Sequence, residues 1–545
     1  VSFELIQAVK LLTNRVSLGH KPPILKPGSA LRERVMRVFK SLLSDSSPSN
    51  VRCASCMLLA SVMSCDPWKN LVSPSFFCKE TNSSGSSKDT EDLGIVRTLL
   101  GIFFEKYSEI DLEVSTPLNK EHVFLTREHH VPTNQYEKNA ICYGIRALLE
   151  GSSQCKNYVY QSGFLSLILE QMHDIHTILS LRQFQPLDDE MPAEISKNFV
   201  KGIRCHLKVC LGVLESTLVN SESTRTNIVE LGGWKTLNKI LTYLYATEIK
   251  TSCLEEDALM CCILRTIVNF TSGATAATKK TICSSKTTLN YLIALGRHLS
   301  VARSHSRDDN TIFEDMMRFT YGIISNVSLE QSCFKAIVRS GFIDGNVDML
   351  ESYSLSLKKS EGKKKSAITL ATKKRRLIIL KNFIRLSITQ HGREALGRNK
   401  TIIDFIKRAL AKPVTSKFYT TGTLNASANV LQPGMDNQLA SLLLLRNIIF
   451  SHSNKVHLIA NSELFKIISA KLSDKRINIS AFAADCLRVL VFNCQKIKAV
   501  IREPATQRIL LSAIFNTKKN LKLADIQSNR MLAYKSNAIE ILSQI

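Results

Sequence analysis

Glycine and proline are scarce in this sequence of 545 residues, which holds 22 glycines and 13 prolines. Sheet-rich folds need many tight turns, and these two residues supply most of them, so the composition argues against such a fold. Long apolar runs are also missing, because the most apolar stretch, Leu439–Phe450, is interrupted by Arg446 and Asn447 and is too short to span a bilayer. The 44% of apolar residues is ample for a core. The sequence therefore predicts a soluble, helical chain without membrane insertion.

Catalytic signatures are absent from the sequence. It has no phosphate-binding Walker A loop, no Gly-x-Ser-x-Gly nucleophile elbow and no His-Glu-x-x-His zinc helix. Cys53 and Cys56 have the spacing of a zinc-ligand pair, but a structural zinc site usually needs a second pair, so they are expected to pack in a core. We therefore predict no enzyme, no catalytic or metal-binding residue, no cofactor and no small-molecule substrate.

A paired cysteine framework is also missing, since the 15 cysteines are odd in number and irregularly spaced. Several lie within apolar helical runs, where a free cysteine behaves as a small hydrophobic residue. The cysteines favour a reducing compartment, the cytosol or the nucleus. The first residue is Val1 rather than methionine, from which we expect the chain to be a piece of a longer protein.

Positive charge is present in excess, and it is unevenly placed. The chain has 72 basic and 47 acidic side chains, a formal charge of +25. Residues 1–270 carry 29 of each sign, so the whole excess lies in residues 271–545. Within that half, Leu357–Lys412 holds 17 basic and 3 acidic residues. The second half is therefore predicted to attract acidic partners at long range.

Apolar residues recur at helical spacing almost throughout the chain. Polar stretches that lack an apolar stripe divide the helices and are predicted to be long, disordered loops. We predict armadillo-like repeats over 1–351, with loops near 79–92, 185–196 and 303–310. A basic loop and helix start over 352–376 is expected to separate them from C-terminal repeats over 377–545, which hold a loop near 411–436.

Internal similarity is the most informative feature of the sequence. Glu150–Phe164 and Asn220–Trp234 share a polar stretch, a short helix with Val or Ile, and a glycine before an aromatic residue. Their glycines, Gly163 and Gly233, keep an offset of 70 residues. The same order of features returns in Asn326–Phe342. Repeats of this kind in a helical chain indicate an all-α, armadillo/HEAT-like α-solenoid of stacked repeats, forming one elongated body.

A repeated asparagine near the end of the apolar helices is the second signature. Its short amide is expected to bond to neighbouring backbone and to fix the link between successive repeats. The structural asparagines predicted in this way are Asn220, Asn269, Asn326, Asn447 and Asn493.

The basic stretch is the strongest candidate for a functional surface. Its lysines begin in a polar loop and continue into a helix that opens at Lys373 and runs through Leu377–Ile388, with Leu377, Leu380, Ile384 and Ile388 on its buried face. A solvated charged loop is the first interpretation of such a run, and an acidic protein partner is the second. Phosphate and a nuclear localisation signal are further alternatives. The candidate residues are Lys358, Lys359, Lys363, Lys364, Lys365, Lys373, Lys374, Arg375, Arg376, Lys381 and Arg385.

Two segments near the C-terminal end resemble the rotatin family, which includes the anastral spindle proteins of centriole assembly. The first is Leu442–Ala460, LLLLRNIIFSHSNKVHLIA, and the second is Cys486–Leu510, which contains Val491-Phe492-Asn493 followed by Gln495-Lys496. The resemblance implies a non-catalytic armadillo-like scaffold of centrioles and ciliary basal bodies, which binds other centriolar proteins, some with acidic segments. It also implies a location in the cytoplasm, cytoskeleton and centrosome, and a role in cilium formation and at spindle poles.

Two other classes of helical-repeat protein stay open. An armadillo-type transport adaptor usually reads basic cargo through an acidic surface with ladders of tryptophan and asparagine, whereas this chain is basic and has only Trp68 and Trp234. A nucleic-acid-binding repeat protein fits the charge, but the basic stretch has few aromatic residues for stacking on bases, which argues against nucleic acid.

Overall fold

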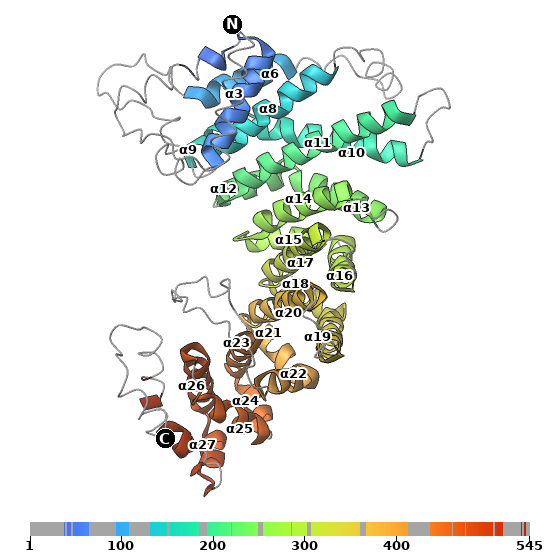
Figure 1. Ribbon diagram of the computed structural model, residues 1–545. Coiled ribbons are helices and arrows are strands. Elements are labelled where there is room, and N and C mark those ends of the chain that lie inside the picture. Colours follow the sequence, from blue (N-terminus) through green and yellow to red (C-terminus); the bar gives the residue numbers. More distant parts are fainter. Residues whose placement is uncertain are drawn as a thin grey trace, which may run out of the picture. The chain divides into compact units, whose positions relative to one another are not determined.

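Helices make up the fold of the computed structural model (Figure 1), and no strand occurs in the parts of the chain it describes. The structure describes residues 38, 41–44, 47–64, 94–107, 131–149, 153–184, 193–219, 221–248, 254–284, 286–301, 307–359, 367–411, 437–459, 462–474, 476–504, 507–508, 510–515, 536 and 539–540. The predicted all-α class is confirmed.

The chain divides into two compact units, Val1–Thr278 and Lys279–Ile545. Unit 1 contains α3 (Ser49–Ser64), α6 (Gly94–Tyr107), α8 (Val131–Leu149), α9 (Ser153–Gln161), α10 (Phe164–Phe184), α11 (Ala193–Leu218), α12 (Glu222–Glu230), α13 (Gly233–Glu248) and α14 (Leu254–Thr271). The unit boundary falls within α15 (Ala276–Ser284).

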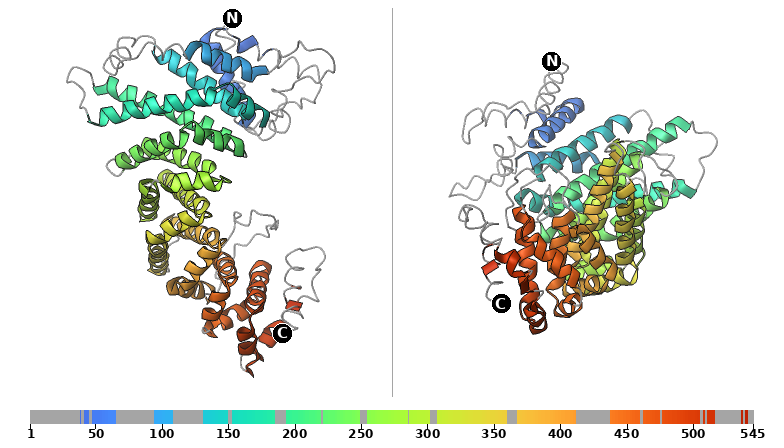
Figure 2. Two further views of the ribbon diagram at one scale, coloured as in Figure 1. Left: turned by 180° about the vertical axis from the view of Figure 1, so that it is seen from behind. Right: turned by 60° about the horizontal axis from the view of Figure 1, so that its bottom comes forward.

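Unit 2 continues the same succession of helices, which the second set of views shows from behind and from below (Figure 2). Its helices are α16 (Lys286–Val301), α17 (Arg307–Val327), α18 (Gln331–Arg339), α19 (Phe342–Lys359), α20 (Ala367–Leu386), α21 (Gln390–Arg398), α22 (Lys400–Ala411), α23 (Asn437–Ile449), α24 (His452–Ile459), α25 (Ser462–Lys471), α26 (Ile477–Val491) and α27 (Gln495–Arg502).

A short helix followed by two further helices is the repeated element. The short first helices are α9, α12, α15, α18, α21, α24 and α27, each of 8 or 9 residues. In unit 2 the third helices α17, α20, α23 and α26 pack each on the next, and the first helices α18, α21, α24 and α27 do the same. Stacking of this kind buries the apolar face of each helix against its neighbours, which gives a continuous core.

Glycine at a left-handed backbone position ends several of the short first helices. Gly163, Gly232 and Gly341 have φ of +79°, +74° and +69°, a region that side chains with a Cβ rarely enter. The glycine that corresponds to Gly163 is therefore Gly232, and the predicted pairing of Gly163 with Gly233 is one residue out of register. Gly233 instead opens α13, where a Cβ would come within 2.5 Å of Ile228.

Several predicted loops begin or end within helices. Residues 352–359 complete α19, because Tyr353 is buried and extends the packed face of that helix. Residues 367–372 form the start of α20, which thus begins six residues before the predicted Lys373. Residues 193–196 belong to α11 and 307–310 to α17. Of the loop predicted near 411–436, Ala411 is the last residue of α22 and 412–436 lie outside the described residues, as do 79–92, 185–192 and 303–306.

Two cysteines of unit 2 form a disulfide, which differs from the expectation of unpaired thiols. Cys283 of α15 is bonded to Cys333 of α18, with a Cα–Cα distance of 5.6 Å. The bond joins the first helices of two successive repeats. The two cysteines are 50 residues apart, and the 15 cysteines of the chain follow no regular spacing. The sequence pattern alone therefore does not predict this pairing. Cys53 and Cys56 are free and buried in α3, as expected of packing residues.

Candidate partner-binding surface

The predicted basic stretch is distributed over the end of α19, a segment outside the described residues, and α20. Lys358 and Lys359 are in the last turn of α19, but the structure does not describe their side chains. Residues Lys363, Lys364 and Lys365 lie outside the described part of the chain. The described part of this surface is therefore the basic half of α20.

Lys373 and Lys374 are exposed on α20. The Lys374 ammonium lies 3.0 Å from the Glu314 carboxylate of α17, and half of its side chain stays exposed. Exposed ion pairs contribute little to stability, so Lys374 is available to a partner at small cost.

Arg375 and Arg376 are buried, with 7% and 6% of their surface exposed, and so they do not belong to a solvent-facing patch. The Arg376 guanidinium lies over the Phe405 ring of α22, 4.7 Å from its centroid. Burial, and then the charge of Arg408, lowers the pKa of Arg376 to about 10. Both arginines are therefore interior residues of the repeat, and Arg376 packs its long side chain over a neighbouring helix.

Lys381 and Arg385 continue the row of cations on α20 and meet Arg318 of α17. Burial, then the charge of Arg385 and then that of Arg318 lower the pKa of Lys381, so each arginine repels the protonated lysine. Arg318 pairs with Asp315 at 2.9 Å and lies over the Phe319 ring. A partner that brings negative charge would relieve this repulsion.

The next two third helices, α23 and α26, also carry partly exposed arginines. Asp485 is fully buried and is shared by Arg446 of α23 and Arg488 of α26, which donates from Nε at 2.9 Å. Two guanidinium groups against one carboxylate leave a net charge of +1. Together with Lys373, Lys374, Lys381 and Arg385, these arginines form what we call the third-helix basic surface.

Of the predicted asparagines, Asn447 makes an inter-repeat contact. Its amide donates to Ser387 Oγ at 3.0 Å, and so ties α23 to the end of α20. Asn382, which was not among the predicted residues, does the same one repeat earlier by donating to the Tyr321 carbonyl and to Ser325 Oγ at 2.8 and 2.7 Å. Both donors are held between third helices.

The other predicted asparagines have different surroundings. The Asn269 carbonyl accepts a hydrogen bond from Arg225, and Asn326 is half-buried near the end of α17. Asn493 lies beyond the end of α26, exposed, with φ of +53°. Its role is the left-handed turn that ends the helix, which asparagine tolerates better than most residues. Asn220 lies outside the described residues.

A basic residue at the fourth position of the short first helix is a signature that was not among those predicted from the sequence. Lys156, Arg225 and Lys455 hold this position in α9, α12 and α24, and all three are buried. Each donates to a carbonyl at the end of the third helix of its own repeat: Val219, Asn269 and Phe492, respectively. A cation at that end satisfies an otherwise open carbonyl and suits the helix dipole.

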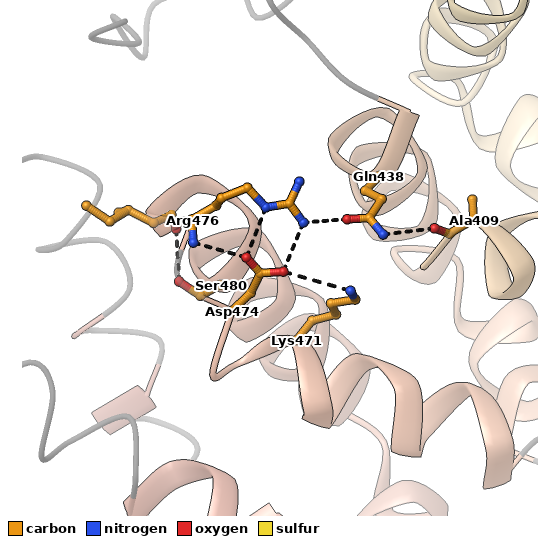
Figure 3. Close-up of polar contacts among 7 residues, drawn as sticks. Ala409, Gln438, Lys471, Asp474, Arg476 and Ser480 are labelled. Carbon is orange, nitrogen blue, oxygen red and sulfur yellow. Dashed lines mark hydrogen bonds and ion pairs between the residues drawn. The ribbon is translucent and has the colours of Figure 1, made fainter. Parts of the chain in front are cut away.

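A polar cluster ties the start of α26 to two neighbouring helices (Figure 3). Arg476 pairs with Asp474 at 2.9 Å and also donates to the Gln438 side-chain oxygen at the start of α23. Gln438 in turn donates to the Ala409 carbonyl in α22 at 3.1 Å. The donors and acceptors of these hydrogen bonds are all residues of the chain. We therefore assign the cluster a structural role rather than a ligand-binding role.

Neither a metal site nor a single membrane-spanning helix occurs in the described segments. They hold no group of three or more His, Cys, Asp or Glu side chains placed to bind a metal ion. None of their helices is by itself long and apolar enough to cross a membrane, although the bent pair α26 and α27 passes on length and composition together.

The succession of a short helix and two longer ones, stacked repeat on repeat, defines an armadillo-like α-solenoid. An engineered protein of known crystal structure shares this fold, with a TM-score of 0.51 and 13% identity over 98% of this chain and 95% of its own. Two designed armadillo repeat proteins, one of them in complex with the peptide (KR)4, align with TM-scores of 0.35 and 0.36 over 60% of this chain.

Sequence comparison relates the chain to rotatin. Human and mouse rotatin are each 21% identical to it, over 412 and 421 residues and 75% of this chain. These matches are consistent with a rotatin-family relationship at low identity. The chain spans 16% of the length of these relatives. No family model matches the sequence.

Proposed function

We propose that this chain is a protein-binding part of a non-catalytic scaffold that acts in centriole and basal-body assembly, and hence in cilium formation and spindle-pole organisation. The observation that carries the proposal is the relationship to rotatin over three quarters of the chain. The resemblance of Leu442–Ala460 and Cys486–Leu510 to that family points the same way. The corresponding location is the cytoplasm and cytoskeleton, at the centrosome, the centriole and the ciliary basal body.

Binding through an extended surface is the mechanism that suits stacked repeats, because successive helices present side chains along one direction. The third-helix basic surface supplies the charge for an acidic segment of another centriolar protein. Burial, and then the charges of Arg385 and Arg318, lower the pKa of Lys381. An acidic segment would offset the repulsion from the two arginines.

Localisation tests the cellular part of the proposal. The tagged chain is expressed in dividing cells beside a centriole marker, and paired dots that coincide with the marker are the expected result. Because the chain spans 16% of its relatives, the same tag is also placed on the full-length protein. A nuclear or diffuse signal of the full-length protein would contradict the proposal.

Charge reversal tests the binding part. Lys373, Lys374, Lys381 and Arg385 are changed to Glu together, while the buried Arg375 and Arg376 are left in place to preserve the fold. Proximity labelling should then lose acidic centriolar neighbours, and binding should weaken as salt rises. The matched control reverses exposed cations of unit 1: Arg97, Lys201, Lys208 and Lys235. If both variants label the acidic neighbours equally, the third-helix basic surface is not the binding site for them.

A further inference from the structure

Exposed apolar side chains recur on the turns between third and first helices in unit 2. Leu329 follows α17, Ile388 follows α20, Phe450 follows α23 and Phe492 follows α26. Their exposed fractions are 47%, 59%, 47% and 63%. One such residue on each of four successive turns is a regular pattern, in contrast with the scattered apolar residues of an ordinary surface. We call these four residues the turn row.

The four turns are neighbours in space because the helices on both sides of them are stacked. The third helices pack each on the next, and so do the first helices that follow the turns. Hydrogen bonds also hold two of these turns to nearby helices. Asn447 of α23 donates to Ser387 Oγ in the turn after α20 at 3.0 Å, and Lys455 of α24 donates to the Phe492 carbonyl in the turn after α26 at 2.6 Å. The labels α18, α21, α24 and α27 follow one another along unit 2 in Figure 1.

Each turn is also held by its own backbone. The Ile388 amide donates to the Arg385 carbonyl at 3.1 Å, the Phe450 amide to Asn447 at 3.2 Å, and the Phe492 amide to Arg488 at 3.0 Å. The side chains of the turn row are therefore presented from fixed positions, which reduces the entropy that a partner would lose on binding them.

Cations flank three of the four apolar residues. The Arg446 guanidinium lies 5.1 Å from the centre of the Phe450 ring, and the Lys455 ammonium 6.0 Å from that of Phe492. The Arg393 guanidinium donates to the Ile388 carbonyl at 3.1 Å. Of the nearby carboxylates, Asp485 is buried between two arginines and Glu330 lies 3.8 Å from Lys280. Lys455 is itself buried, so the accessible positive charge here comes from Arg446 and Arg393, which are partly exposed. The edge is thus apolar, with partly exposed cations beside two of its four residues.

From this pattern we propose that the turn row binds an acidic amphipathic helix of another protein, with an apolar residue at every seventh position. Packed helices lie about 8–10 Å apart, so successive turns should be separated by roughly that distance. Seven residues of an α-helix advance about 10.5 Å, and they return the side chain to nearly the same face. Four contacts then need about 22 residues of helix.

Other occupants fit the edge less well. Three residues of a β-strand also advance about 10 Å, but they point to opposite faces, so a strand would meet only every other turn. A second copy of this chain would bring the same cations against one another, which disfavours a pairing of turn rows. Apart from Arg446, which belongs to both, the turn row and its flanking cations are different residues from those of the third-helix basic surface. The inference does not depend on the proposed cellular role.

The test uses two labelled synthetic peptides of identical composition, rich in Glu and Ala, and the 545-residue chain. One peptide carries four leucines at every seventh position, and the other carries them at every fifth. Fluorescence anisotropy should show the first peptide binding at least about tenfold more tightly than the second. Equal binding of the two peptides, or no binding of the first, would overturn the proposal.

A variant with Leu329, Ile388, Phe450 and Phe492 changed to Ser should lose this difference between the peptides. The control changes four other exposed apolar residues, Leu231, Val338, Ile477 and Leu511, to Ser and should keep it. Sedimentation equilibrium of the wild-type chain measures self-association, and so tests whether the turn row binds a second copy of this chain. Self-association that the turn-row variant abolishes and the control retains would assign the edge to a second copy and overturn the proposal.

Discussion

Lys455 and Phe492 are joined twice, through the Phe492 carbonyl, which accepts from Nζ at 2.6 Å, and through its ring, 6.0 Å from the same ammonium. Lys455 is the fourth residue of a first helix and Phe492 follows the third helix of the same repeat. The contact therefore joins the first helix, α24, to the end of the third helix, α26, of one repeat. Burial lowers the pKa of Lys455, so part of what the contact contributes is offset by desolvation.

Replacement of Lys455 by Met should destabilise its repeat by about 1–2 kcal/mol, because the Phe492 carbonyl then loses a charged donor at a partly buried helix end. Hydrogen exchange of the last turn of α26, followed by mass spectrometry, checks this. The control is Lys466→Met in α25, where the lysine is exposed and exchange in α26 should not change. Equal protection in wild type and Lys455→Met would show that the ammonium adds nothing.

The cation at the fourth position of the first helix could have been found from the sequence. Arg225 follows Lys156 by 69 residues, and Gly232 follows Gly163 by the same distance. Alignment of the repeats on Gly233 instead shifts the register by one residue and hides the shared cation. A glycine pair leaves that choice open, because only the backbone conformation shows which of the two adopts a positive φ.

Other features of the surface could not be predicted from local pattern. Arg375 and Arg376 stand in a run of four basic residues, yet Arg376 packs on Phe405, which is far along the chain on another helix. Ile388 has the spacing of a core residue but lies beyond the end of α20 at Leu386, and so it is exposed. Contacts between distant residues decide burial, whereas helical periodicity shows only which residues share a face.

Replacement of Asp485 by Asn should destabilise unit 2 by about 3 kcal/mol or more, because the carboxylate is fully buried and balances Arg446 and Arg488. Its loss leaves two guanidinium groups without their shared counter-charge. Urea unfolding followed by circular dichroism, with hydrogen exchange to locate the effect in α23 and α26, measures it. Asp404→Asn is the matched control, because Asp404 is a half-exposed partner of Lys407. A small loss equal to that of the control would contradict the role assigned to Asp485.

His206 should make unit 1 less stable in mild acid. It is buried between Asn139, 2.7 Å from Nδ1, and Gln171, 3.1 Å from Nε2. Burial, and then the charge of Lys138, lowers its pKa from 6.5 to about 3. The folded chain therefore keeps His206 neutral, and the unfolded chain binds the extra proton below about pH 6.5. Stability is fully present above that pH and falls by about 1.4 kcal/mol per unit as pH drops towards 3.

Hydrogen exchange of α11 between about pH 7.5 and 4.5, corrected for intrinsic rates, measures this loss. In His206→Gln the residue no longer titrates, so its α11 should show a shallower dependence on pH, even if the variant is less stable at neutral pH. Exposed His173 provides the control, since His173→Gln should keep the slope of the wild type. Identical slopes in all three proteins would mean that His206 is not held neutral in the fold.

The disulfide between Cys283 and Cys333 gives a last prediction. The bond closes a sequence separation of 50 residues, and restriction of the unfolded chain by a loop of that size corresponds to about 4 kcal/mol. Alkylation of the purified, non-reduced chain should modify the exposed Cys205 at once and leave Cys283 and Cys333 unmodified until a reductant is added. In the oxidised sample Cys333→Ser should lower the thermal midpoint of unit 2, whereas Cys205→Ser should not. In reductant the wild type should lose this advantage. Immediate alkylation of both Cys283 and Cys333 would show that the two thiols are unbonded in solution.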